Sequence, residues 1–302
     1  MKSNVANISL ETFENIVIEQ LKERGYVTRI VDIPGKLASE HRLIKEPRKD
    51  ELTIAIKIEE LYSDYVKNLT SEHPVPIGDI VDDIIEILDM ESPVNDASAS
   101  TLLDSWDGAK GKLFIAVYNK DRHAEYLNGN VYTCIEDLAI APRLLIERLE
   151  DGDIMSTMIS QELLKSWDKT EEEVITEAFK SAPAVMPIEI HNMGNLIKET
   201  FSNVKNLKDF DSDMIVVTTK GNITGASLFY DGVLDGFANQ FDSFLYIFPS
   251  STCEFIVASG KNCPCPEELL HIVCDIDANA VSPDCVLSDH AYVYRNGKIG
   301  SL

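Results

Sequence analysis

Apolar residues follow two different periods in the N-terminal part of the chain. After Ser9 they are spaced three and four apart, which predicts an amphipathic helix whose N-terminus is capped by the serine. Apolar and polar residues alternate over residues 52–58, so a strand with one buried face is expected there. Helical spacing returns over residues 59–69, and Pro76 is placed to open a further helix. This mixture of helices and strands predicts an α+β region.

Residues 92–100 separate this region from the rest of the chain. The segment reads Ser-Pro-Val-Asn-Asp-Ala-Ser-Ala-Ser, and such a run of small and polar residues is typical of a linker. We therefore expect an N-terminal α+β subdomain over residues 1–95 and a larger C-terminal α+β domain over residues 105–302.

The chain after this linker begins with strand signals. Residues 113–118 and 154–159 are short apolar runs of the kind that form buried strands. Residues 135–149, which lie between them, show helical spacing but contain Pro142. The pattern predicts two strands and, between them, a helix that the proline interrupts.

A capping box marks the start of the next helix. Thr170 is followed three residues later by Glu173, and each side chain can bind the backbone N–H of the other residue. Val174 and Phe179 then share one helical face. Pro183 is expected to end this helix, because proline cannot continue the backbone hydrogen bonds.

A pattern of two strands and a helix occurs twice after residue 213. The expected strands are residues 214–217, 226–230, 244–248 and 255–258, and the expected helices are residues 232–241 and 266–277. Short turns rich in glycine, proline or serine join the strands of each pair, which favours antiparallel pairing. We therefore expect an α+β fold with antiparallel sheets and helices packed on one face, in which a strand-strand-helix unit is repeated in the C-terminal part.

The charge of the chain narrows the classes of partner. The sequence has 51 acidic and 27 basic residues, a formal net charge of −24. Such a surface repels nucleic acid and anionic membranes, so neither is an expected partner. If the protein binds another protein, we expect that partner to have a basic surface.

The cysteines and the N-terminal residues suggest a compartment. Six cysteines occur at irregular spacing, no secretion signal is recognisable at the start, and no apolar run approaches the ~18 residues of a membrane span. A cytoplasmic location with reduced thiols is therefore expected.

Several distinctive stretches resemble a known family. They are residues 52–65, 113–119, 163–187, 244–254 and 287–294. In these stretches the chain is similar to an uncharacterised domain-of-unknown-function family of Gram-positive gut anaerobes. The resemblance implies a shared fold, but no established activity and no cofactor. Proteins of this kind often carry a histidine before Glu254, where this chain has Cys253, so a base role for that histidine does not carry over.

The candidate catalytic residues fall in two short segments. They are Ser250, Ser251, Cys253 and Glu254 in the turn that follows Pro249, and Asp289 and His290 after Ser288. A serine or cysteine, a histidine and a carboxylate can together supply a nucleophile, a base and an orienting acid. However, adjacent residues in a strand point to opposite faces, so an Asp289–His290 dyad is not expected. Pro-Ser-Ser is also typical of a β-turn, which favours a structural role.

Four residues have an arrangement that could bind zinc. They are Cys263, Cys265, His271 and Cys274, in the pattern C-x-C-x5-H-x2-C. The usual C-x2-C spacing is missing, and the chain is long enough to fold around a large core without a metal. We therefore expect no metal site and no other cofactor.

Three functions remain open from the sequence. The favoured one is an acidic cytoplasmic protein-binding or regulatory module without catalytic activity. The second is a hydrolase or thiol-dependent enzyme that uses the 249–254 turn and residues 288–290. The third is an immunity or antagonist protein that binds a basic partner. Convergence of Cys253, Glu254 and His290 in one pocket would favour the enzyme.

Overall fold

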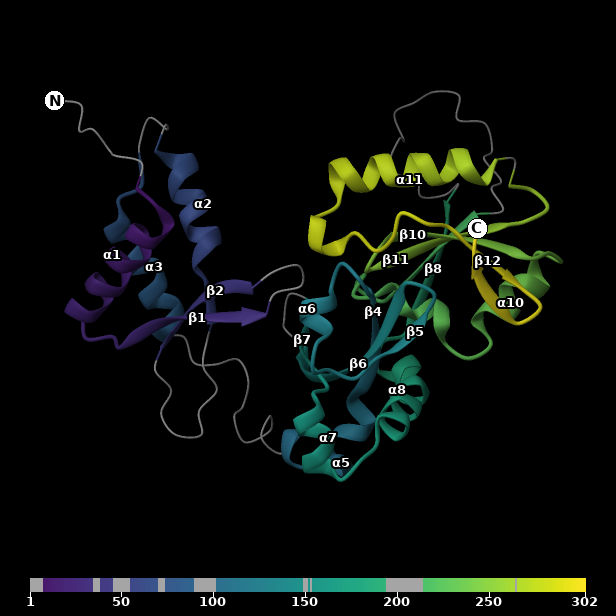
Figure 1. Ribbon diagram of the computed structural model, residues 1–302, viewed down its shortest axis with the longest axis horizontal. Helices are drawn as coiled ribbons and strands as arrows, with labels where there is room; N and C mark the ends of the chain where they lie inside the picture. Colours follow the sequence, from purple (N-terminus) through teal and green to yellow (C-terminus); the bar gives the residue numbers. More distant parts are fainter. Residues whose placement is uncertain are drawn as a thin grey trace. The chain divides into compact units, whose positions relative to one another are not determined.

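The computed structural model describes residues 8–34, 39–45, 55–69, 74–89, 102–148, 152, 154–193, 214–263 and 265–302. They form helices and antiparallel sheets, so the predicted α+β fold is confirmed. The chain divides into two compact units, Met1–Ser98 and Ala99–Leu302 (Figure 1). The predicted linker over residues 92–100 lies outside the described residues.

In its described residues, the smaller unit is a three-stranded antiparallel sheet with three helices. Its elements are α1 (Leu10–Glu23), β1 (Thr28–Pro34), β2 (Ser39–Lys45), β3 (Ala55–Lys57), α2 (Ile58–Asn68) and α3 (Ile77–Asp89), with strand order β1-β2-β3. Ser9 caps α1 as predicted, since its hydroxyl accepts a hydrogen bond from Thr12 N. Apolar side chains such as Phe13, Val17 and Ile84 are completely buried between these elements.

The larger unit begins with a four-stranded antiparallel sheet. Its strands are β4 (Leu113–Asn119), β5 (Thr133–Ile135), β6 (Leu138–Arg148) and β7 (Ile154–Met158). Its helical segments are α5 (Trp106–Ala109), η1 (Lys110–Lys112), α6 (Ala124–Leu127), α7 (Gln161–Trp167) and α8 (Glu171–Val185). Strand β6 pairs with β4, β5 and β7 and so holds this sheet together.

The predicted helix over residues 135–149 is wrong. Most of this stretch is strand β6, and Pro142 lies within the strand opposite Ile115 instead of interrupting a helix. A continuous apolar run satisfies helical spacing and a buried strand equally well, so periodicity alone could not separate the two. The consequence for the site is a tight β5–β6 turn at Glu136 and Asp137, where Glu136 has a positive φ of 54°.

Helix α8 begins as predicted but ends later. The Thr170 hydroxyl accepts from Glu173 N at 3.2 Å, and Glu173 Oε2 accepts from Thr170 N at 2.9 Å, which completes the capping box. Pro183 was expected to end this helix, but it lies inside α8, which continues to Val185. In the last turn of a helix a proline removes only one backbone hydrogen bond, so it is tolerated there.

Replacement of Glu173 by glutamine should remove a pH-dependent part of the stability. Hydrogen bonds from the Thr170 backbone and from Lys169 lower the pKa of Glu173 from 4.5 to about 2. The stabilisation is therefore complete above about pH 4.5 and is lost as the pH falls towards 2. Melting temperatures of wild type and Glu173→Gln should differ most near neutral pH and converge in acid. A gap that stays constant with pH would contradict this role of the charge.

A six-stranded antiparallel sheet forms the rest of the larger unit. Its strands are β8 (Ile188–Asn192), β9 (Met214–Thr219), β10 (Leu245–Ser251), β11 (Glu254–Ser259), β12 (Tyr292–Arg295) and β13 (Lys298–Ser301), in the order β13-β12-β10-β11-β9-β8. The helical segments are η2 (Gly225–Phe229), α10 (Val233–Gln240), α11 (Pro266–Ala280) and η3 (Pro283–Cys285). The predicted pairing of residues 244–248 with 255–258 is confirmed, with Ile247 opposite Val257.

The first of the two predicted hairpins is wrong. Residues 226–230 form most of the 3-10 segment η2 and do not pair with β9, whose neighbours are β8 and β11. The Thr224 hydroxyl accepts from Ala226 N at 3.1 Å and so starts a tight turn. Ser227 Oγ then donates to Thr218 O at 2.7 Å. These local bonds fold the segment back against the sheet, which a strand pattern in the sequence does not show.

The two faces of the six-stranded sheet are covered differently. On one face α11 packs its Val273 against sheet residues such as Phe248 and Ile256. Sheet side chains such as Val257 belong instead to a second core that includes Val117 and other residues of the first sheet. Figure 1 shows α11 lying across the six-stranded sheet and α8 beside β4 and β6. The larger unit is therefore layered, and the ends of its two sheets lie close enough to share polar contacts.

Candidate functional site

Residues 288–290 lie in the loop that enters β12 and not in a strand. His290 Nδ1 is 2.7 Å from Asp289 Oδ1, so the two residues form the contact that was not expected from the sequence. The expectation was wrong because the alternation of side chains holds only in an extended strand. Ser288 Oγ lies 3.4 Å from His290 Nδ1 and accepts a hydrogen bond from His290 N at 3.2 Å. A serine, a histidine and a carboxylate therefore do meet in this loop.

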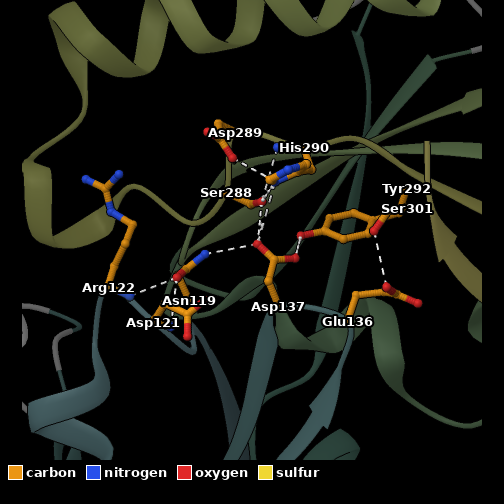
Figure 2. Close-up of polar contacts among 10 residues, drawn as sticks. All are labelled: Asn119, Asp121, Arg122, Glu136, Asp137, Ser288, Asp289, His290, Tyr292 and Ser301. Atoms are coloured by element: carbon orange, nitrogen blue, oxygen red, sulfur yellow. Dashed lines mark hydrogen bonds and ion pairs between the residues drawn. The ribbon is translucent and has the colours of Figure 1, made fainter.

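The centre of this cluster is Asp137, which the sequence did not indicate. It lies in the β5–β6 turn, and Figure 2 shows its carboxylate facing the loop before β12. Oδ2 accepts from Ser288 Oγ at 2.7 Å and from Asn119 Nδ2 at 3.0 Å, and Oδ1 accepts from Tyr292 OH at 2.5 Å. His290 Nδ1 is 4.0 Å from Oδ2. We call Asn119, Asp137, Ser288, His290 and Tyr292 the Asp137 cluster.

A second set of hydrogen bonds holds the Asp137 cluster in place from β4. Asn119 Oδ1 accepts from the backbone N–H groups of Asp121 and Arg122 at 3.0 and 2.9 Å. His123 is completely buried, with Nδ1 3.2 Å from Asn119 N and Nε2 3.2 Å from Asp284 O. These bonds join the end of β4 to the segment that precedes β12. The cluster is thus a junction between the two sheets of the larger unit.

Burial decides what the Asp137 cluster can do chemically. Ser288 is only 3% exposed, and its hydroxyl proton is directed at Asp137. A nucleophilic serine needs an accessible oxygen and a base that takes its proton during attack. Burial, followed by the hydrogen bond to Asp137, raises the pKa of the Tyr292 phenol, so this group remains a donor. The His290 side chain is 58% exposed. The cluster therefore contains the residue types of a catalytic site, but its serine is buried and its histidine is exposed.

The other predicted segment forms a hydrogen-bonded group of its own at the β10–β11 turn. Ser250 Oγ donates to Glu254 Oε1 at 2.8 Å, and Ser251 Oγ accepts from Cys253 N at 3.1 Å. Thr252 N donates to Cys285 O at 2.8 Å, which ties this turn to the segment before β12. Both serine hydroxyls therefore stabilise the turn itself.

The four candidate zinc ligands are not brought together. His271 is exposed, whereas Cys263, Cys265 and Cys274 are half-buried. Cys265 Sγ lies 3.8 Å from Glu267 Oε2, and burial raises the pKa of the Cys263 thiol. Across the ranges that the structure describes, His, Cys, Asp and Glu form no group of three or more that could hold a metal. The expectation that the protein carries no zinc stays a prediction.

A groove of about 340 Å³ lies elsewhere on the larger unit. Phe179 of α8, Leu234 and Asp235 of α10, and Tyr294 and Ile299 of the β12–β13 hairpin line it. Tyr294 OH donates to Asp235, and this hydrogen bond is the main reason why the pKa of Tyr294 is raised to about 12. This groove has no signal in the sequence, because its lining residues come from elements that are far apart in the chain.

A second hollow of about 410 Å³ is lined by Trp106, Lys169, Glu173 and neighbours on α8. Lys169 Nζ lies 5.5 Å from the centre of the Trp106 ring and 3.0 Å from Glu173 Oε1. The ammonium group of Lys169 in this hollow therefore already has two partners within the chain, the Trp106 ring and the Glu173 carboxylate.

In the part of the chain that is described, no helix combines the length and the apolar composition needed to span a bilayer.

Comparison with known proteins gives a family and no activity. Neither the curated proteins nor the solved structures contain a match to this chain. A protein-family model described as a family of unknown function, DUF5688, matches residues 11–296. The chain therefore belongs to the DUF5688 family.

Proposed function

We propose that this protein is a cytoplasmic module that binds a protein with a basic surface. The observation that carries the proposal is the burial of Ser288, whose hydroxyl donates to Asp137 at 2.7 Å. The serine that would serve as the nucleophile in this loop is therefore part of a structural hydrogen bond. The chain also has a large excess of carboxylates, with 51 acidic against 27 basic residues.

Ion pairs within the larger unit support this interpretation. Several lysines are already paired with a neighbouring acid: Lys110 with Asp107, Lys169 with Glu173, Lys180 with Glu177, and Lys261 with Asp242. Other acids, such as Glu172 and Asp231, are exposed. A surface of this kind attracts a basic partner and increases the rate of association.

The enzyme hypothesis is weaker on this geometry. A serine hydrolase requires an accessible serine next to His290, but Ser288 is buried and the hydroxyls of Ser250 and Ser251 form hydrogen bonds within the 249–254 turn. An immunity or antagonist protein is a special case of the present proposal, in which the basic partner is a toxin or nuclease. Nucleic acid and membranes are not proposed as partners, because the net charge opposes both.

The proposal can be tested with defined peptides. Biolayer interferometry of the full chain against immobilised basic, neutral and acidic peptides of equal length should give binding to the basic peptides alone. The association rate should fall as salt rises, since the Debye length shortens from about 10 Å at about 0.1 M to about 3 Å at about 1 M. Binding to acidic peptides, or rates that do not change with salt, would contradict the proposal.

A further inference from the structure

We propose that the groove between α10 and the β12–β13 hairpin receives an arginine or lysine side chain of a bound protein segment. This inference rests on the proposed function and names the site and the chemical group that it recognises. We call this hollow the α10 groove; Asp231, Gly232, Leu234, Asp235, Tyr294 and Ile299 are among its lining residues.

The size and lining of the α10 groove suit a long side chain. Its volume of about 340 Å³ is at the lower end of the range for ligand sites, about 300–1,000 Å³. Phe179, Phe229 and Leu234 offer apolar contact, and these side chains are half-buried. An arginine or lysine has an apolar stem that can cover such a surface while its charged end stays near polar groups.

The charges of the α10 groove select a cation. The groove is lined by two carboxylates, Asp231 and Asp235, both on exposed residues. Among the described residues that line it, there is no Lys, Arg or His. Asp235 accepts a hydrogen bond from Tyr294 OH, but this phenol carries no charge at neutral pH, and the hydrogen bond raises its pKa further, to about 12. The charge of Asp235 is therefore not cancelled within the groove.

The chemistry of the lining disfavours other occupants. A purely apolar group would remove water from the two carboxylates without replacing its hydrogen bonds, which is costly. An anion would be repelled by both. A guanidinium or ammonium group satisfies the carboxylates, and aromatic rings such as that of Tyr294 add an attraction for cations.

Calorimetric titration with two matched peptides tests the inference. The first is a short peptide of alternating leucine and arginine, and the second has citrulline in place of every arginine, which removes the charge and keeps the shape. Wild type should bind the arginine peptide and not the citrulline peptide. The double variant Asp231→Asn/Asp235→Asn should bind the arginine peptide about ten-fold more weakly, since two charge-assisted contacts are lost.

A matched control separates the groove from the general acidity of the chain. Glu267 and Glu268 are exposed residues of α11, which belongs to a different core from the groove. The variant Glu267→Gln/Glu268→Gln loses the same charge and should bind like wild type. Asparagine at position 235 still offers an oxygen to Tyr294, and equal melting temperatures would show that both variants are folded.

The outcomes distinguish the groove from the wider proposal. If both double variants bind the arginine peptide equally well, the groove is not the site, and binding to a basic partner stands. If wild type binds the arginine and citrulline peptides equally well, charge recognition fails and both proposals fall. If wild type binds neither peptide, the groove inference is overturned, and the peptide panel decides the wider proposal.

Discussion

Asp137→Ala should lower the free energy of unfolding of the larger unit by about 3 kcal/mol. The substitution leaves the Asn119 amide, the Ser288 hydroxyl and the Tyr292 hydroxyl without their shared acceptor. A hydrogen bond to a charged group contributes about 1.5–3 kcal/mol, and water entering at the side chain, which is 25% exposed, recovers part of the loss. For a domain of this size the melting temperature should fall by about 6–12 °C.

Denaturant unfolding followed by tryptophan fluorescence measures this effect, because both tryptophans, Trp106 and Trp167, belong to the larger unit. Asp121→Ala is the matched control. Asp121 is an exposed acid two residues after Asn119, and it binds Asn119 through its backbone N–H and not through its carboxylate. We expect it to change stability by less than about 0.5 kcal/mol, as is usual for surface positions. An equally small effect of Asp137→Ala would mean that the Asp137 cluster does not hold the two sheets together.

Gly225→Ala should destabilise the larger unit by about 1–3 kcal/mol, the usual cost of overpacking a core. A β-carbon at this position would lie 2.9 Å from a ring carbon of Phe255 and 3.0 Å from the backbone nitrogen of Glu254. The backbone of β11 cannot give way without disturbing its pairing with β9 and β10. Gly225 N also donates to Thr252 O at 2.9 Å, which holds η2 against this hairpin.

Gly236→Ala is the control for this substitution, and we expect a change of opposite sign. Gly236 lies within α10, and a β-carbon there would meet no atom within 4 Å. Alanine is favoured over glycine inside a helix by about 1 kcal/mol, so this variant should be more stable than wild type. Thermal unfolding of both variants decides the point. A Gly225→Ala variant as stable as wild type would contradict the close approach of η2 to β11.

The sequence predicted the elements whose signals are local. Ser9 as an N-cap, Thr170 with Glu173 as a capping box, and the β10–β11 hairpin depend on residues a few positions apart, and all three are present. The predictions that failed could not be decided from residue type and spacing alone. Strand β6 was mistaken for a helix because both of its faces are apolar, and η2 was mistaken for a strand because side chains of Thr224 and Ser227 redirect the backbone.

The site was only half predictable for the same reason. Ser288, Asp289 and His290 were recognisable as a group because they are adjacent in sequence. Asp137 was not, because it lies 151 residues before Ser288 and follows a run that gave no turn signal. Asp137 indicates that the site is structural, because the carboxylate that binds Ser288 also binds Asn119 and Tyr292. Only the fold shows that the serine is buried in a junction between sheets.

Labelling with a fluorophosphonate probe tests most directly whether the serine-containing segments are structural. Such probes react with serines that are both accessible and activated by a base. Intact-mass measurement of the full chain should show no stoichiometric adduct, because Ser288 is 3% exposed and the Ser250 and Ser251 hydroxyls form hydrogen bonds within the β10–β11 turn. One adduct per chain that is lost in Ser288→Ala, Ser250→Ala or Ser251→Ala would contradict the structural role and would identify an enzyme.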